Sequence, residues 1–340
     1  MTLDLDLKGA GLQVGVAAID FSDDAHAYGV IPVPVAMIAG GHGPTVLMTG
    51  GTHGDEWEGQ LLARRIIRTL GPADVHGRLI VLPALNQPAV LAARRISPVD
   101  GGNLNRAFPG DPDGGPTAIL ADFVERELLP QSDFAVDLHS GGAASRYLPC
   151  AFLRIDGDAA LTGQKVAGAD AFGLPATVVV AAAGESRTLS AAADRQGVVM
   201  VAAELSGGSA VDVDVLAEAE AALGRLLAHW RILEPPAASG PTAPTTFLRL
   251  AAHVTVPFDG LLEPVARLGD VVREGDLLAR AHRLDDLNAV PVDLRAPVGG
   301  VVAIARVPVR VQAGSHACTI GTPLSRADVT SLGSADGNSR

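Results

Sequence analysis

Hydrophobic and polar residues along positions 1–235 follow the rhythm of a sheet with helices packed against both faces. Short apolar runs, typical of strands buried on both sides, are separated by longer stretches in which apolar residues recur every three or four positions. We expect strands at residues 46–48, 78–84, 134–138, 151–155, 176–183 and 198–203, and helices at residues 58–70, 117–129, 159–172, 186–196 and 211–230. This order predicts an α/β fold with a mostly parallel sheet. Residues 28–39 alternate and contain prolines, which predicts an edge strand.

The pattern changes at the end of this α/β region, and the change predicts a second domain. Residues 236–246 are rich in proline and alanine and are interpreted as a linker. Residues 247–325 contain short β-rich runs separated by glycine, and two runs, residues 261–278 and 294–302, are similar to the small β-sandwich of biotinyl and lipoyl carrier domains. This stretch has no lysine to carry such a group, so only the scaffold is expected. Residues 326–340 are predicted to form a disordered tail.

Composition restricts the classes of function that the chain can have. Its 340 residues are 48% hydrophobic and 19% charged, the formal net charge is −12, and the only lysines are Lys8 and Lys165. An acidic chain without a basic cluster is a poor candidate for binding nucleic acid or an anionic membrane. Two cysteines are too few for a disulfide framework. Because the sequence shows no signal peptide and no run of ~20 apolar residues, we expect a cytoplasmic protein without a membrane span.

Two glycine-containing turns, each after a predicted strand, carry histidine. His53 is followed three residues later by Glu56, and His139 follows the strand at residues 134–138. An imidazole nitrogen and a carboxylate oxygen are ligands of catalytic zinc, and the carboxyl ends of strands are where sites gather in α/β sheets. A lone His-x-x-Glu pair is a weak signal, which the second histidine strengthens. His42 precedes its strand and is interpreted as a turn histidine.

Two further features point to the same edge of the sheet. Glu204 ends the apolar run at residues 198–203, and a carboxylate there must be paired, solvated at a cleft or protonated. A helix cap or a surface charge is the alternative, and we favour a catalytic group because Glu204 is the third polar residue at a strand end. The long polar loop at residues 94–115 contains asparagine, arginine and glycine, and such loops in compact domains are usually functional or disordered.

Four separated segments together resemble the succinylglutamate desuccinylase/aspartoacylase family. In chain order they are His53-Gly54-Asp55-Glu56, Asn103-Leu104-Asn105-Arg106, Asp137-Leu138-His139 and Ala203-Glu204-Leu205. The resemblance implies a zinc-carboxypeptidase-like mixed sheet flanked by helices, with a smaller all-β C-terminal domain and one zinc ion per chain. Within the family, residues 100–110 are most similar to the N-acetyl-diaminobutyrate deacetylases of ectoine degradation.

The resemblance also implies roles for individual residues, beginning with three zinc ligands: His53, Glu56 and His139. Asp55 and Glu58 flank the glutamate ligand, and the family match selects Glu56 over both. Asp137 either orients a ligand or is an ordinary polar residue at a strand end, and both interpretations stay open.

The remaining implied roles concern catalysis and substrate binding. Glu204 would take the proton of the attacking water and pass it to the leaving amine. Arg95 would stabilise the oxyanion, and Arg94 is the alternative because the spacing to Asn105 is longer than in aspartoacylases. For an isolated arginine, a surface salt bridge is the competing interpretation. Two residues would hold the substrate carboxylate: Asn105 and Arg106. Independently of the resemblance, Arg187 lies before a helix in a glycine-containing loop and is expected to reach the substrate.

We therefore expect a zinc-dependent amidohydrolase that removes an acyl group, most simply acetyl, from a small N-acylated amino acid such as N-acetyl-diaminobutyrate. Zinc carboxypeptidase, aspartoacylase and succinylglutamate desuccinylase activities are the alternatives, because the same zinc chemistry serves all of them. A non-catalytic metal-binding protein is disfavoured because every expected polar residue is present. The sequence leaves open a homo-oligomer, for which the apolar C-terminal strands are a candidate interface.

Overall fold

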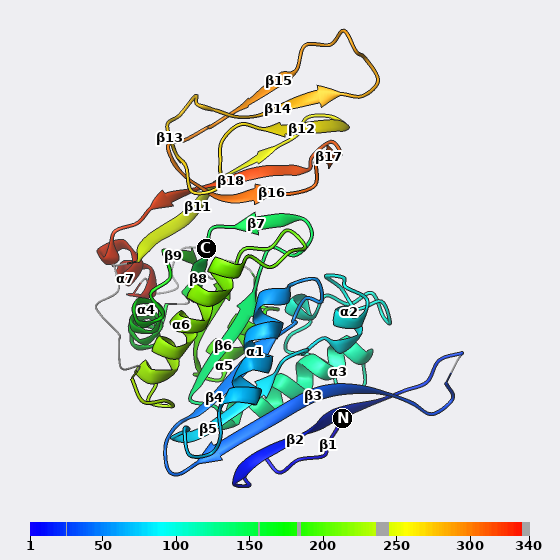
Figure 1. Cartoon of the computed structure of the whole chain (residues 1–340), viewed down its shortest axis with the longest axis vertical. Coiled ribbons are helices and arrows are strands. Elements are labelled where there is room, and N and C mark those ends of the chain that lie inside the picture. The colour runs from blue at the N-terminus through cyan, green and yellow to red at the C-terminus, as the bar shows by residue number, and fades with distance from the viewer. Residues whose placement is uncertain (25, 156, 182–184, 236–244, 335–340) are drawn as a thin grey trace.

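The computed structural model describes residues 1–340 except 25, 156, 182–184, 236–244 and 335–340. A mixed sheet runs through the structure (Figure 1). Its strands follow the order β1-β2-β3-β5-β4-β6-β10-β8-β9-β11, and the sheet continues into the C-terminal region. β4 pairs in parallel with β5 and β6, and β6 with β10, whereas β8 runs antiparallel to β10. The strands of this part are β1 Thr2–Leu3, β2 Gly11–Phe21, β3 Gly29–Gly40, β4 Thr45–Gly50, β5 Gly77–Leu82, β6 Phe134–His139, β7 Ser145–Tyr147, β8 Cys150–Ile155, β9 Ala176–Ala181, β10 Val199–Glu204 and β11 Thr246–Thr255.

Helices cover both faces of the sheet, which confirms the predicted α/β class. One hydrophobic core joins the sheet to α1, α4 and α6, and a second core on the other face includes α3 and α5. None of the helices in the described part of the chain has both the length and the apolar character needed to cross a membrane. The helices are α1 Trp57–Thr69, α2 Gln87–Leu91, α3 Pro116–Phe123, α4 Ala159–Phe172, α5 Leu189–Arg195, α6 Val213–His229 and α7 Arg326–Ser334.

The C-terminal strands form two facing sheets above the α/β part (Figure 1). One sheet has the order β15-β14-β12-β17, and the other continues the main sheet through β18, β16 and β13. A separate hydrophobic core fills the space between them. The predicted β-sheet fold of the C-terminal region is therefore confirmed. The strands are β12 Gly260–Pro264, β13 Val271–Val272, β14 Leu277–Arg283, β15 Val292–Arg295, β16 Gly300–Arg306, β17 Arg310–Val311 and β18 His316–Pro323.

Three expectations about the ends of elements need correction. The edge-strand prediction for residues 28–39 is wrong, because β3 lies between β2 and β5. The disordered-tail prediction is wrong for Arg326–Ser334, which forms α7 and packs Val329 into the core, while residues 335–340 lie outside the described part. Most of the expected linker, residues 236–244, also lies outside it. Thr246 already belongs to β11, which pairs in parallel with β9 and joins the two regions through one sheet.

The helix expected at residues 117–129 ends early. α3 stops at Phe123 and is followed by a π-helical turn, Val124–Leu128, and a 3-10 turn, Leu129–Gln131. Pro130 has no amide hydrogen for an α-helical bond, which is a physical reason for the change of hydrogen-bonding pattern.

Close packing of α1 against β6 brings two chain segments of the site together. Gly59, on the first turns of α1, lies so near β6 that a Cβ atom there would sit 2.2 Å from the carbonyl oxygen of Leu138. Glu56 immediately precedes α1 and His139 immediately follows Leu138. The absence of a side chain at Gly59 therefore sets the separation between these two polar residues.

We predict that Gly59→Ala lowers the free energy of unfolding by about 1–3 kcal/mol, because the added methyl group overpacks a rigid contact. The matched control is Gly224→Ala in α6, where an added Cβ would meet no described atom within 4 Å apart from its chain neighbours and the backbone of its own helix. That control should gain about 0.5–1 kcal/mol, since alanine is the better helix former. Chemical denaturation of both variants provides the measurement, and equal stability changes would contradict this account of the α1–β6 contact.

Candidate metal centre and active-site cavity

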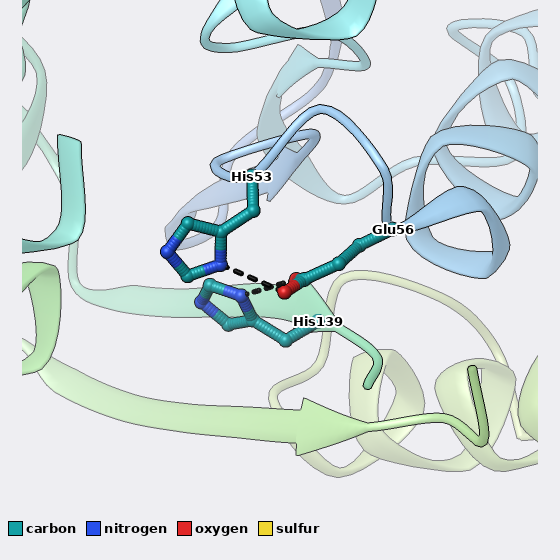
Figure 2. A group of neighbouring side chains, drawn as sticks. All are labelled: His53, Glu56 and His139. Carbon is teal, nitrogen blue, oxygen red and sulfur yellow. Dashed lines mark hydrogen bonds and ion pairs between the residues drawn. The ribbon is translucent and has the colours of Figure 1, made fainter. Parts of the chain in front are cut away.

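The three residues predicted as metal ligands lie together at the carboxyl ends of β4 and β6. Nδ1 of His53 is 2.8 Å from Oε1 of Glu56, and Nδ1 of His139 is 2.7 Å from Oε2 of the same carboxylate. Figure 2 shows both rings turned toward that carboxylate. All three side chains are buried, and their ligand atoms lie within 4.8 Å of one another. This arrangement can hold a single metal ion with two nitrogen ligands and one carboxylate.

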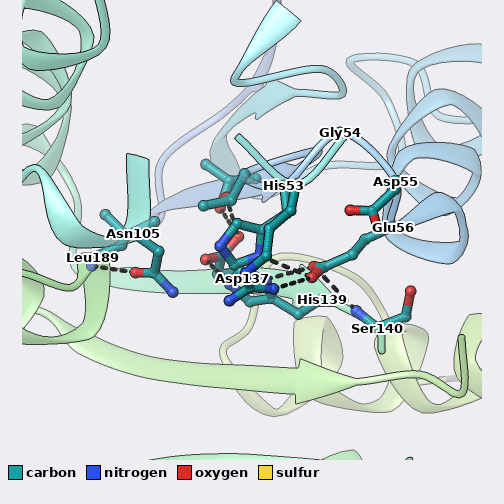
Figure 3. A network of polar contacts seen from close by, with 12 residues as sticks. His53, Gly54, Asp55, Glu56, Asn105, Asp137, His139, Ser140 and Leu189 are labelled. Carbon is teal, nitrogen blue, oxygen red and sulfur yellow. Dashed lines mark hydrogen bonds and ion pairs between the residues drawn. The ribbon is translucent and has the colours of Figure 1, made fainter. Parts of the chain in front are cut away.

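A buried carboxylate holds the His139 ring from its far side. Nε2 of His139 is 2.6 Å from Oδ2 of Asp137. The other oxygen of Asp137 accepts hydrogen bonds from the hydroxyls of Thr49 and Thr52, at 2.8 and 2.9 Å. Figure 3 shows Asp137 beside the three candidate ligands. Asp137 thus orients His139 through Nε2 and leaves Nδ1 for a metal, which is the usual arrangement around metal-binding histidines.

An amide oxygen contacts Nε2 of His53, as the carboxylate of Asp137 contacts Nε2 of His139. Nε2 of His53 is 3.2 Å from Oδ1 of Asn103. The same oxygen accepts a hydrogen bond from the backbone N–H of Asn105 at 3.1 Å, which identifies it as the acceptor end of the amide. His53 therefore donates through Nε2, and the lone pair on its Nδ1 points at Glu56. A lone pair facing a carboxylate is repulsive unless a cation lies between them, so this donor set fits a metal ion.

The pKa values of the centre show the same need for positive charge. Burial would raise the pKa of Glu56, but the charge of His139 and its hydrogen bond hold it at about 2. Burial opposes protonation of His139, yet the charges of Asp137 and Glu56 raise its pKa well above the ordinary value. Burial lowers the pKa of His53. A proton on His139 thus balances two carboxylates, and a divalent cation would replace that proton.

A cavity of about 310 Å³ opens beside the centre, lined by both histidines and Glu204. β10 pairs with β6 in a register that places Glu204 next to His139. Oε2 of Glu204 is buried and has no hydrogen-bond partner among the described residues. Burial, followed by the charge of Glu56, raises the pKa of Glu204 well above its ordinary value. A partnerless carboxyl at the wall of a cavity is well placed to exchange a proton with a bound molecule.

The structure distinguishes between the two arginines that follow α2. Nη1 of Arg95 lies 3.2 Å from Oε1 of Glu56, and Arg95 lines the cavity. Arg94 is exposed and is not among the residues that line the cavity. Of the pair, Arg95 is therefore the one whose cationic group meets the centre.

The residues predicted to bind substrate are only partly brought together. Asn105 and Arg106 both line the cavity. Arg106 forms an ion pair with Glu185, with Nε 3.2 Å from Oε2, and the Asn105 side chain accepts a hydrogen bond from the backbone of Leu189. Arg187 lies outside the cavity lining and pairs with Glu185 at 3.2 Å, with its side chain 62% exposed.

The acidic neighbours of Glu56 have other surroundings. Asp55 accepts a hydrogen bond from the backbone N–H of Ala143 at 2.9 Å, which ties the turn after His139 to the turn after His53. Glu58 is fully buried on the first turn of α1, outside the ligand group. Two site residues escape prediction from the sequence. Asn103 stands in the same motif as Asn105, which is the available signal, and Tyr147 reaches the cavity from a short strand that shows no pattern of its own.

Comparison with known proteins agrees with this geometry. Residues 42–230 match the family model described as the succinylglutamate desuccinylase/aspartoacylase catalytic domain. The chain is 38% identical over 319 residues to an N-alpha-acetyl-L-2,4-diaminobutyric acid deacetylase of Halomonas elongata, and the match covers 93% of each chain.

Solved structures show the same likeness. A product-bound structure of the ectoine utilization protein EutE of Ruegeria pomeroyi is 36% identical, with a TM-score of 0.90 over 94% of this chain and 98% of that one. A succinylglutamate desuccinylase of Silicibacter sp. TM1040 is also 36% identical, with a TM-score of 0.90 over 95% and 98%. The predicted family is thus confirmed: the chain belongs to the succinylglutamate desuccinylase/aspartoacylase family.

Proposed function

We propose that the protein is a zinc-dependent amidohydrolase that removes the acetyl group from an N-acetylated amino acid, with Nα-acetyl-2,4-diaminobutyrate as its substrate. The observation that carries this proposal is the placement of Glu204 on the same cavity as the two histidines of the His53–Glu56–His139 group, with its Oε2 lacking a hydrogen-bond partner among the described residues. The 38% identity with the Halomonas elongata deacetylase, over 93% of each chain, supports the choice of substrate.

In this proposal His53, Glu56 and His139 hold one zinc ion. When bound, zinc polarises the scissile carbonyl and lowers the pKa of a water molecule toward 7. Asp137 keeps His139 in the ring orientation and tautomer that such binding needs, through the 2.6 Å contact to Nε2. Asn103 does the same for His53 through its amide oxygen.

Glu204 acts as general base and then as general acid. Its carboxylate takes the proton from the attacking water, and the protonated carboxyl then gives that proton to the nitrogen of the departing amine. The raised pKa of Glu204 suits the first step, because burial and the charge of Glu56 make its carboxylate a stronger base than an exposed one. Zinc bound nearby would move that pKa downward through its charge.

Arginine side chains supply positive charge for the substrate. Arg95 stabilises the developing oxyanion from its position beside Glu56. Arg106 binds the substrate carboxylate, which replaces Glu185 as its partner, and Asn105 contributes from the same wall of the cavity. Guanidinium groups suit this task because they bind carboxylates with two parallel hydrogen bonds.

A carboxypeptidase activity is the main alternative within the same chemistry. Its substrates are larger than an acetylated amino acid, and Leu250 of β11 lines the cavity of about 310 Å³ from the side of the C-terminal region. This closure favours small substrates over peptides.

The function is tested by incubating zinc-loaded protein with Nα-acetyl-2,4-diaminobutyrate, its Nγ-acetyl isomer, N-acetylaspartate, N-succinylglutamate and an unacylated dipeptide. We expect acetate release from the Nα-acetyl compound, lost on chelation and restored by zinc. Faster cleavage of the dipeptide would show that the protein is a carboxypeptidase instead. Faster cleavage of N-acetylaspartate or N-succinylglutamate would support the metal-dependent mechanism but contradict the proposed substrate.

Glu204→Gln should lower kcat by about 10²–10⁴-fold, since the amide cannot take a proton from water. Bound zinc should stay near one equivalent, because Glu204 is outside the ligand group. Glu218→Gln, an exposed glutamate on α6, is the matched control and should keep full activity. Steady-state kinetics with metal analysis decides the point, and a Glu204→Gln protein as active as the control would exclude general-base catalysis by this residue.

The charges around His139 predict a pH response of the metal-free protein. Its folded-state pKa is raised, so protonation of His139 contributes stability that is complete below about pH 6.5 and is lost as the pH rises through the folded-state pKa. We expect the Tm of the metal-free protein to fall as the pH rises above about 6.5. The zinc-loaded protein should lack this fall, because the metal ion replaces the proton.

Metal-free Asp137→Asn is the control for this pH response. The substitution removes a charge that raises the pKa of His139, so its decline with pH should be weaker. Calorimetry at several pH values compares the two proteins, and parallel profiles would show that the Asp137–His139 pair does not produce the response.

A further inference from the structure

The turn that follows His139 is held by both regions of the molecule. β7 Ser145–Tyr147 belongs to the α/β part in sequence but pairs antiparallel with β16 of the C-terminal region. Backbone hydrogen bonds from Leu148 to Ala303 and from Val307 to Ala144 extend this pairing. On its other side, the backbone N–H of Tyr147 donates to the carbonyl of Ser206 at 3.0 Å, two residues after Glu204. Tyr147 is thus fixed between the segment that carries Glu204 and the C-terminal strands.

Tyr147 lines the cavity together with two residues of the proposed reaction, Arg95 and Glu204. Burial, followed by the charges of Glu204, Cys150 and Glu56, raises the pKa of its phenol above the ordinary value. Arg95 acts on it in the opposite direction from across the same space. The phenol therefore keeps its proton throughout the working pH range. Its hydroxyl donates to no residue in the part of the chain that the structure describes, so the hydrogen is available to a bound molecule.

We propose that Tyr147 is a further catalytic residue, whose hydroxyl donates a hydrogen bond to the oxygen that becomes negatively charged when water attacks the amide carbonyl. The inference rests on the proposed function and adds a neutral donor to the positive charge of Arg95. Tyr147 lines the cavity together with Arg95 and Glu204, so a carbonyl bound in this cavity can meet all three. A donor fixed in advance is effective because it needs no reorganisation as the charge appears.

The strand pairing supports this role over a structural one. The pairing with β16 and the bond to Ser206 use backbone atoms alone, so they persist when the hydroxyl is removed. Tyr147→Phe keeps the ring against the cavity wall and deletes only the donor. The other tyrosine of the chain, Tyr28, is 98% exposed and provides the matched control Tyr28→Phe.

The first test compares kcat and KM of the two zinc-loaded variants on Nα-acetyl-2,4-diaminobutyrate. We expect Tyr147→Phe to lower kcat about 10- to 150-fold with KM within threefold of wild type, since a hydrogen bond to a charge that exists only in the transition state is lost. A kcat equal to that of Tyr28→Phe would overturn the proposal. A raised KM with unchanged kcat would also overturn it, because that pattern assigns the hydroxyl to ground-state binding.

The second test does not depend on turnover. It measures, by calorimetry, binding of a phosphonamidate in which a tetrahedral phosphorus with charged oxygens replaces the acetyl carbonyl carbon. We expect affinity to fall about 10- to 150-fold in Tyr147→Phe and to be unchanged in Tyr28→Phe. Equal affinity in the two variants would refute the role of Tyr147. If wild type and Tyr28→Phe bind the analogue but cleave no acetylated amino acid, the proposed function fails while the assignment of Tyr147 is judged on binding.

Discussion

The molecule depends on one electrostatic constraint, which is the presence of a buried carboxylate between two buried imidazoles. Each carboxylate oxygen of Glu56 faces the Nδ1 atom of one ring, and oxygen atoms of Asp137 and Asn103 contact the opposite nitrogens. No arrangement of protons satisfies both imidazole lone pairs and the carboxylates at low cost in a buried site. A divalent cation does so, and for this reason the three side chains could hold a metal ion rather than form an ordinary buried ion pair.

The fold meets this constraint by bringing strand ends together at close range. Gly59 lets α1 approach β6, which sets the distance between Glu56 and His139. The register of β10 against β6 then places Glu204 beside His139 without further adjustment. The C-terminal strands complete the cavity through Leu250 and through their pairing with the strand that carries Tyr147. Glu204 and Tyr147 thus lie on strands, whereas the cavity arginines, Arg95 and Arg106, come from the segments that connect the main elements.

Sequence patterns predict what depends on neighbours along the chain. The apolar runs identify the central strands, and the His-x-x-Glu turn with His139 identifies the candidate ligands, because strand ends in such sheets share one edge. Long-range pairing is not visible in this way. The local sequence does not show that β2 would pair with the outer edge of β3. It also does not show that residues 326–334 would form a helix packed on α4, or that the strand of Tyr147 would pair with β16. The choice of Arg95 over Arg94 likewise depends on loop geometry, since the two residues are identical and adjacent.

X-ray absorption at the zinc K-edge of protein loaded with one equivalent of zinc tests the central claim most directly. The account predicts two imidazole nitrogens at about 2.0–2.1 Å and light oxygen atoms at about 2.0–2.2 Å, with no sulfur near 2.3 Å. Cys150 pairs in register with Glu204 and is the cysteine nearest in the fold to this centre, so sulfur is a meaningful alternative ligand. A sulfur neighbour, or a signal from one imidazole instead of two, would contradict the metal centre described by His53, Glu56 and His139.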